Sequence, residues 1–359
     1  MRSPTACLNL ATVLVVIAVA AAPATATLMA VPDVVRVTSP QGIEAWRADS
    51  RHLPDPERDD PTTVQRFLAG ADPVEQRELA EAYPGLVGNL DGAPPALRYA
   101  ANQRAMDAAG APYQGRSGQY LLFDLRGQGN VAQVFGDLST ADRIAVLVPG
   151  GGNRADNFWR GVGGKPFRSP SVQASDLYQA ARRHGSVADR FAVVAWLGYD
   201  APDGLDASAA REDLARTGAA ALDRFVTGLT AIRPQATVAL LGHSYGSTVI
   251  GLAAHRLPRQ VTDIAVFGSP GMGVGDVSQL GTSARVWAGM SRHDVMRWVP
   301  GLRLFGLGHS TQPTDPDFGA TVFSTDGVAD HDHYLAPGTD AQAELTSIAM
   351  FGTDSRGAK

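Results

Sequence analysis

The sequence has 359 residues, of which 44% are hydrophobic and 19% are charged, and its formal net charge at pH 7 is -5. This composition is that of a globular protein with a sizeable core, arranged as one large domain or two modest ones. The basic residues are scattered along the chain, which argues against the clustered positive face that nucleic-acid binding requires. We therefore expect no nucleic-acid partner.

The N-terminal residues have the pattern of an export signal. Arg2 precedes an uncharged apolar run from Leu10 to Ala22, and the small residues 24–26 (ATA) supply a cleavage site. The run is shorter than the roughly 20 residues that span a bilayer. We therefore expect residues 1–26 to be removed as a signal peptide, leaving a secreted or extracytoplasmic protein with no stable membrane span; an uncleaved anchor is the alternative. Cys7, the only cysteine, would be lost with the signal, together with thiol chemistry and cysteine-ligated metals.

Residues 27–115 are predicted to form an N-terminal extension and a small helical segment. Between Asp49 and Gly115 apolar residues recur at helical spacing, as at Val64, Phe67 and Leu68, and prolines interrupt the pattern. The pattern changes past residue 118, so we assign residues 116–359 to a separate, larger region.

The larger region alternates predicted strands with predicted helices. Short runs rich in β-forming residues indicate seven strands, and helix-like stretches lie between the later ones. This alternation predicts an α/β fold with a mostly parallel sheet and helices on both faces. The predicted strands are 119–125, 131–138, 144–148, 191–197, 237–241, 261–267 and 284–288, and the predicted helices are 175–183, 207–229, 247–256 and 341–351.

A glycine-rich turn, residues 149–153 (PGGGN), follows the third predicted strand. No Gly-Lys-Ser/Thr follows it, which argues against a nucleotide-binding loop. Backbone N–H groups in such a turn are suited to stabilising an oxyanion; we choose the N–H of Gly151, with Gly152 as the alternative. The segment that follows, 153–177, contains Phe158, Trp159 and Phe167, which either line a substrate pocket or belong to the core.

Residues 242–246 (GHSYG) form the turn between a predicted buried strand and an apolar-faced helix. This strand-turn-helix setting is typical of a nucleophile elbow, in which a strained serine is exposed and the flanking glycines make room for the helix. We predict that Ser244 is the nucleophile and that the N–H of Tyr245 is one oxyanion donor; an ordinary tight turn is the alternative. His243 is expected to pack or hydrogen-bond under the elbow.

A serine nucleophile needs a histidine base and a carboxylate that orients it, and in this arrangement the chain order is serine, acid, histidine. Asp294, after the seventh predicted strand, is the preferred acid, and Asp276 is its rival. His331 and His333 in the late loop 330–334 (DHDHY) are the two candidate bases. Two histidines around one aspartate are weak evidence for a metal site, and we expect no metal.

Six short segments, spread over most of the chain beyond residue 49, match a known family. They are 87–92 (VGNLDG), 98–102 (RYAAN), 195–202 (AWLGYDAP), 242–247 (GHSYGS), 268–271 (GSPG) and 331–334 (HDHY). With these segments the chain resembles the α/β-hydrolase superfamily, and within it a largely uncharacterised family of hydrolases from high-GC bacteria. The family pattern places its histidine three residues before a tyrosine, which favours His331. The resemblance implies an α/β-hydrolase domain over 116–359, with the helical segment in the same folding unit, but it implies no substrate.

Together these features predict an exported serine hydrolase that cleaves a carboxylic ester through an acyl-enzyme, using Ser244, Asp294 and His331 and no cofactor. The expected substrate is a small-molecule or lipid-like ester. A peptidase or acyltransferase with the same triad, and a non-catalytic binding protein on a hydrolase fold, are the alternatives.

Overall fold

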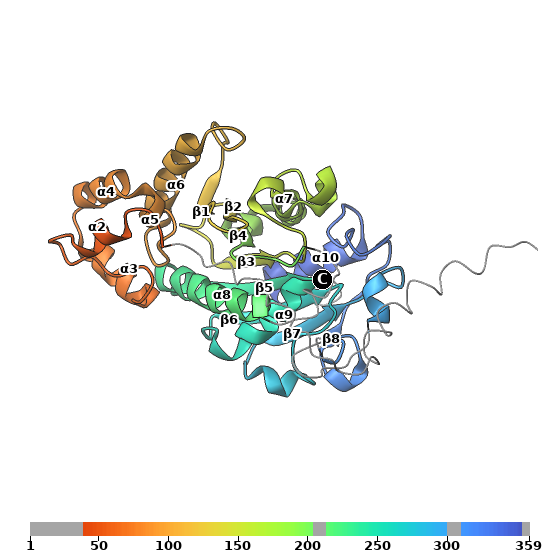
Figure 1. The fold of residues 1–359 in the computed structure, drawn as a ribbon. Helices are drawn as coiled ribbons and strands as arrows, with labels where there is room; N and C mark the ends of the chain where they lie inside the picture. The colour runs from red at the N-terminus through yellow and green to blue at the C-terminus, as the bar shows by residue number, and fades with distance from the viewer. Residues whose placement is uncertain (1–38, 204–212, 300–309, 354–359) are drawn as a thin grey trace, which may run out of the picture. The chain divides into compact units, whose positions relative to one another are not determined.

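An eight-stranded sheet with the order β1-β2-β4-β3-β5-β6-β7-β8 forms the centre of the computed structural model, which describes residues 39–203, 213–299 and 310–353 (Figure 1). β1 and β2 are antiparallel to each other, and β2 is antiparallel to β4; the remaining neighbours are parallel. The strands are β1 Gln119–Asp124, β2 Asn130–Phe135, β3 Arg143–Val148, β4 Phe191–Leu197, β5 Thr237–His243, β6 Val261–Phe267, β7 Arg285–Gly289 and β8 Thr321–Val322.

The predicted mostly parallel sheet is confirmed. The burial of its central strands explains why the sequence has long apolar runs there. All seven residues of β4 are buried, as are most residues of β3, β5 and β6. Strands covered on both faces require continuous runs of apolar, largely β-branched side chains. β8 was missed, because two exposed residues carry no alternating pattern.

Helices cover both faces of this sheet. α7 (Pro170–Arg182) packs against α10 (Asp340–Phe351), and α8 (Asp213–Ile232) packs against α9 (Tyr245–Ala253), as Figure 1 also shows for the latter pair. α7 begins five residues before the predicted 175, because the Ser169 hydroxyl caps it by accepting the N–H of Val172 and a proline follows at its first position. Part of the predicted helix 207–229 lies outside the described residues.

Within the described residues, five helices precede the sheet, and they have a hydrophobic core of their own, which includes Trp46, Leu68 and Leu79. These N-terminal helices contact the sheet region through α3 on α8 and α6 on β1. Residues from Ser39 onward form one compact unit, while the boundary at residue 116 stays a prediction. The helices are α2 Ile43–Arg47, α3 Pro61–Gly70, α4 Pro73–Ala82, α5 Pro84–Val87 and α6 Pro95–Ala109.

The export signal predicted for residues 1–26 lies outside the described residues. In the part of the chain that the structure describes, no helix combines the length and the apolar character needed to cross a membrane.

The carboxyl ends of the parallel strands carry the segments singled out by the sequence. The glycine-rich turn follows β3, Ser244 follows β5, and Asp294 lies in the loop after β7. In open α/β sheets this edge is where ligands bind, so the fold brings the candidate residues to one edge.

Candidate active site

Ser244 forms the turn between β5 and α9 by itself, because the strand ends at residue 243 and the helix begins at residue 245. Its backbone has φ 53° and ψ -125°, a sparsely populated conformation that costs about 1–3 kcal/mol. The N–H of Ser244 donates to the carbonyl of Phe267 in β6 at 3.0 Å. The neighbouring strand therefore helps to hold the strained turn in place.

The glycines on either side of the turn lie where no larger residue fits. A Cβ atom on Gly242 would lie 2.8 Å from the Cδ1 atom of Ile250, and one on Gly246 would lie 2.3 Å from the carbonyl oxygen of Val148. Both glycines therefore allow α9 to pack closely against the strands, as the motif predicts.

Three side chains that are far apart in the sequence form one hydrogen-bonded chain. Ser244 Oγ lies 2.9 Å from His331 Nε2, and His331 Nδ1 lies 2.9 Å from each carboxylate oxygen of Asp294. Because a carboxylate only accepts hydrogen bonds, Nδ1 carries the proton and Nε2 is left to accept from the serine hydroxyl. The structure thus brings together the three residues that the sequence singled out.

Asp294 is buried, and every hydrogen bond to it stabilises the charged carboxylate. Burial alone would raise the pKa of Asp294, but hydrogen bonds from His331, from the Tyr334 hydroxyl at 2.6 Å and from the Met296 N–H at 2.8 Å hold the pKa below its ordinary value. Burial and the nearby Asp294 charge raise the pKa of Tyr334, so this hydroxyl stays protonated as a donor. In the sequence, Tyr334 served only to identify the histidine three residues before it, and the hydrogen bond of Tyr334 to the acid was not predicted.

The two rival residues have other partners. His333 Nδ1 lies 2.6 Å from Asp330 Oδ1, and its ring stacks on Phe167 with 4.0 Å between ring centroids. Asp276 lies at the surface, where it accepts hydrogen bonds from Ser278 and Gln279. In this structure His331 and Asp294 are the pair that reaches the serine.

His243 ties the loop of the candidate base to the end of β5. Its Nε2–H donates to the backbone carbonyl of His331 at 2.8 Å, and its ring stacks on Phe267. Burial lowers the pKa of His243 from 6.5 to about 4, and the adjacent His331 contributes to the decrease. His243 is therefore neutral in the folded protein near pH 7, in agreement with the hydrogen-bonding role expected for it.

This depressed pKa predicts a loss of stability in acid. Between pH 6.5 and pH 4 the unfolded chain binds a proton at His243 and the folded chain does not, so the free energy of unfolding falls as the pH falls. We expect His243 to account for a loss of up to about 3 kcal/mol. Urea unfolding at pH 7 and at pH 4 measures the effect, and His243→Asn should show a correspondingly smaller loss; an equal loss in both proteins contradicts the assignment.

The glycine-rich turn lies directly against the serine, since a Cβ atom on Gly150 would lie 2.6 Å from Ser244 Cβ. The N–H of Gly152 donates to the carbonyl of Pro202 at 2.6 Å, so the alternative oxyanion donor is engaged in the fold. For the N–H of Gly151, no acceptor occurs within the described ranges. Tyr245 is the first residue of α9, where the positive end of the helix dipole faces the site. Gly151 thus remains the better candidate of the two glycines.

The aromatic residues of segment 153–177 divide between core and site. Phe158 is fully buried, and Trp159 packs against Tyr113, Tyr120 and the guanidinium of Arg116, so both belong to the protein's packing. Phe167 is the exception, because it stacks on the loop that carries the candidate base.

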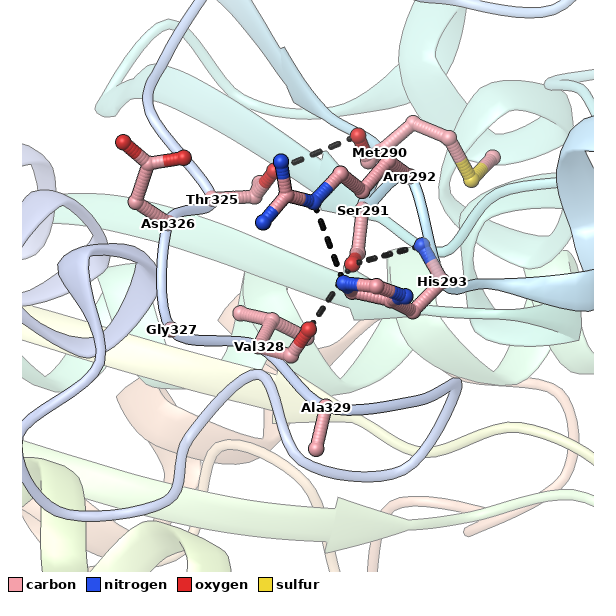
Figure 2. A pocket seen from close by; sticks show the side chains of 9 residues that line it. All are labelled: Met290, Ser291, Arg292, His293, Thr325, Asp326, Gly327, Val328 and Ala329. Atoms are coloured by element: carbon pink, nitrogen blue, oxygen red, sulfur yellow. Dashed lines mark hydrogen bonds between the residues drawn. The ribbon is translucent and has the colours of Figure 1, made fainter.

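A polar cavity of about 310 Å³ lies between the segments that lead to Asp294 and to His331 (Figure 2). It is lined by residues 290–293 and 325–329, and the Ser291 hydroxyl joins the two by donating to the carbonyl of Val328 at 2.9 Å. Ser244 does not line this cavity. Across the described ranges, no group of three or more His, Cys, Asp or Glu residues is arranged to hold a metal ion.

The chain is similar to two mycobacterial proteins whose names give no activity. It is 30% identical over 260 residues to the uncharacterised protein Rv2079 of Mycobacterium tuberculosis, covering 64% of this chain and 38% of that protein. It is 33% identical over 177 residues to the uncharacterised protein Mb0988c of Mycobacterium bovis, covering 48% of this chain and 64% of that one. This chain therefore spans less than two thirds of either relative.

Solved structures with similar folds include esterase PE8, with a TM-score of 0.39, 16% identity and coverage of 60% of this chain and 95% of that one. Dienelactone hydrolase from Anabaena variabilis has a TM-score of 0.38 and 13% identity, with coverage of 65% and 94%. Residues 124–304, half of the 359-residue chain, match the sequence model described as Alpha/beta hydrolase. By this match, and by the sheet and elbow described above, the chain belongs to the α/β-hydrolase family.

Proposed function

We propose that this chain is an exported serine hydrolase that cleaves a carboxylic ester through an acyl-enzyme intermediate. The single observation that carries the proposal is the unbroken hydrogen-bond path from Ser244 Oγ through His331 to Asp294. A serine hydroxyl at neutral pH is a poor nucleophile, and a neutral histidine held by a buried carboxylate is the arrangement that activates it. The sequence pattern of residues 1–26 is the support for export.

In the first half of the reaction Ser244 Oγ attacks the ester carbonyl carbon while His331 Nε2 takes the hydroxyl proton. The negative charge on the carbonyl oxygen is stabilised by the N–H groups of Tyr245 and Gly151. Asp294 stabilises the imidazolium that forms, and the carboxylate stays charged because of its three hydrogen-bond donors. When the tetrahedral intermediate collapses, His331 returns the proton to the leaving alkoxide and the alcohol departs.

In the second half a water molecule replaces the alcohol. His331 takes a proton from this water, the resulting hydroxide attacks the acyl carbon, and the same two N–H groups stabilise the second oxyanion. Collapse of this intermediate releases the carboxylic acid, and His331 returns the proton to Ser244. An amine or sugar in place of water would make the same site an acyltransferase.

Labelling with a fluorophosphonate probe tests the proposal, because this reagent reacts with activated serines. We expect one labelled peptide, containing Ser244, in the folded protein, no labelling in Ser244→Ala, and none after heat denaturation. Labelling of the folded protein with the fluorophosphonate probe should also abolish the release of p-nitrophenol from p-nitrophenyl butyrate. A folded protein that neither labels nor turns over an ester series contradicts the proposal and favours a binding protein on this fold.

A further inference from the structure

Side chains hold the successive carbonyl groups of the glycine-rich turn. The Tyr199 hydroxyl donates to the carbonyl of Pro149 at 2.6 Å, Asn153 Nδ2 donates to that of Gly150 at 2.9 Å, and Asn157 Nδ2 donates to that of Gly152 at 2.8 Å. Three carbonyl oxygens of the turn are thus held in place by side-chain donors.

The contact at Gly150 has a particular consequence, because the Gly150 carbonyl and the Gly151 N–H belong to the same peptide unit. A trans peptide is planar, and its C=O and N–H bonds point in opposite directions. A hydrogen bond that holds the Gly150 oxygen therefore also fixes the direction of the Gly151 N–H. Asn153 Nδ2 makes a second, longer contact of 3.4 Å with the carbonyl of Gly151, which restrains the next peptide as well.

We propose that Asn153 is a positioning residue that orients the Gly151 N–H toward the oxyanion. This inference rests on the proposed function, since it concerns the donor that stabilises the tetrahedral intermediate. Within the described ranges the Asn153 side chain has no hydrogen bond to Ser244 or His331; it acts through the peptide that joins Gly150 to Gly151. Preorganisation of this kind is what makes an oxyanion donor effective, since no energy is then spent on reorienting it during the reaction.

The environment of Asn153 supports a role for its amide nitrogen. The residue is 7% exposed, and within the described ranges its Oδ1 atom has no hydrogen-bond partner. A buried amide oxygen without a partner is destabilising. The Oδ1 atom therefore makes no hydrogen bond that would stabilise the fold. The Nδ2 group, in contrast, donates to two carbonyls of the turn.

Asn157 provides a matched control. It makes the same kind of contact with the carbonyl of Gly152, but that peptide carries the N–H of Asn153, which is not the assigned oxyanion donor. The Asn157→Ala variant removes an amide of the same size that contacts the same turn, together with the hydrogen bond of 3.0 Å from the Arg154 N–H to Asn157 Oδ1, without releasing the peptide that joins Gly150 to Gly151.

The test compares Asn153→Ala and Asn153→Leu with wild type and with Asn157→Ala. The assays are steady-state hydrolysis of p-nitrophenyl butyrate and inhibition by an alkyl trifluoromethyl ketone, which adds to the serine and places an anionic oxygen in the oxyanion site. For the Asn153 variants we expect kcat to fall by about 10- to 100-fold, less than the 10²–10³ typical of a lost donor, and KM to stay within about threefold. The inhibition constant of the ketone should rise by the same factor as kcat/KM falls, whereas Asn157→Ala should change kcat by less than about threefold.

The matched change in ketone affinity separates positioning from a general effect on structure. Thermal unfolding identifies any variant that fails to fold, and Asn153→Ser, which keeps a donor on a smaller side chain, then takes its place with an expected kcat between wild type and Asn153→Ala. An active wild-type protein whose Asn153 variants keep wild-type kcat and ketone affinity overturns this inference alone. A wild-type protein that shows no turnover overturns the proposed function and this inference with it.

Discussion

Replacing Ser244 with alanine is expected to lower kcat for p-nitrophenyl butyrate by about 10⁶-fold, leaving the residual catalysis that the oxyanion donors and substrate binding supply. The reason is that the variant keeps the histidine, the acid and the oxyanion donors but has no atom that forms the acyl-enzyme. Removing the hydroxyl also frees His331 Nε2 of its 2.9 Å contact without disturbing the pair with Asp294. Stopped assays with high enzyme concentration, after purification from a strain without background esterase, measure the residual rate.

Ser247→Ala is the matched control for this variant. Ser247 is a fully buried serine on the first turn of α9, and its hydroxyl donates to the carbonyl of Gly242 at 3.1 Å. Its loss should cost about 1 kcal/mol of stability and leave kcat within about threefold of wild type. Comparable losses of activity in both serine variants would mean that the elbow is sensitive to any change and that Ser244 has no special chemical role.

Replacing His331 with alanine is expected to reduce kcat about as much as Ser244→Ala does, on the order of 10⁶-fold, because nucleophile and base act as one unit. His333→Ala, two residues further along the same loop, should change kcat by less than about threefold. His333 is bonded to Asp330 and stacked on Phe167, whereas His331 lies between the serine and the acid. Burst kinetics with the same p-nitrophenyl ester measure both the acylation step and the turnover.

The double variant Ser244→Ala/His331→Ala sharpens this comparison. If the two residues act together, the double variant should be no slower than either single variant within about tenfold. A His333→Ala variant as slow as His331→Ala, or an additive loss in the double variant, would contradict the assignment of His331 as the base.

Local patterns in the sequence were enough to predict the sheet and the turn that carries Ser244. The apolar runs of β3 to β7 predict buried strands because a strand covered on both faces has no polar side, and all five are present in the structure. The residues 242–246 predict an elbow because close packing of α9 against the strands requires the flanking glycines, and Ser244 between them has the positive φ of such a turn. The short strand β8, with two exposed residues, has no such pattern and was missed.

The sequence by itself therefore determined the α/β fold, the turn that carries Ser244 and a short set of candidate partners. Only the tertiary structure decided which candidates meet: Asp294 and not Asp276 lies against His331, and the N–H of Gly152 is engaged by the carbonyl of Pro202. The contacts of Tyr334 and Asn153 likewise appeared only there. The physical reason is the separation along the sequence of the residues that interact. Periodicity and turn conformation depend on neighbours within a few residues, whereas the hydrogen bonds of the site join different loops at the carboxyl edge of the sheet.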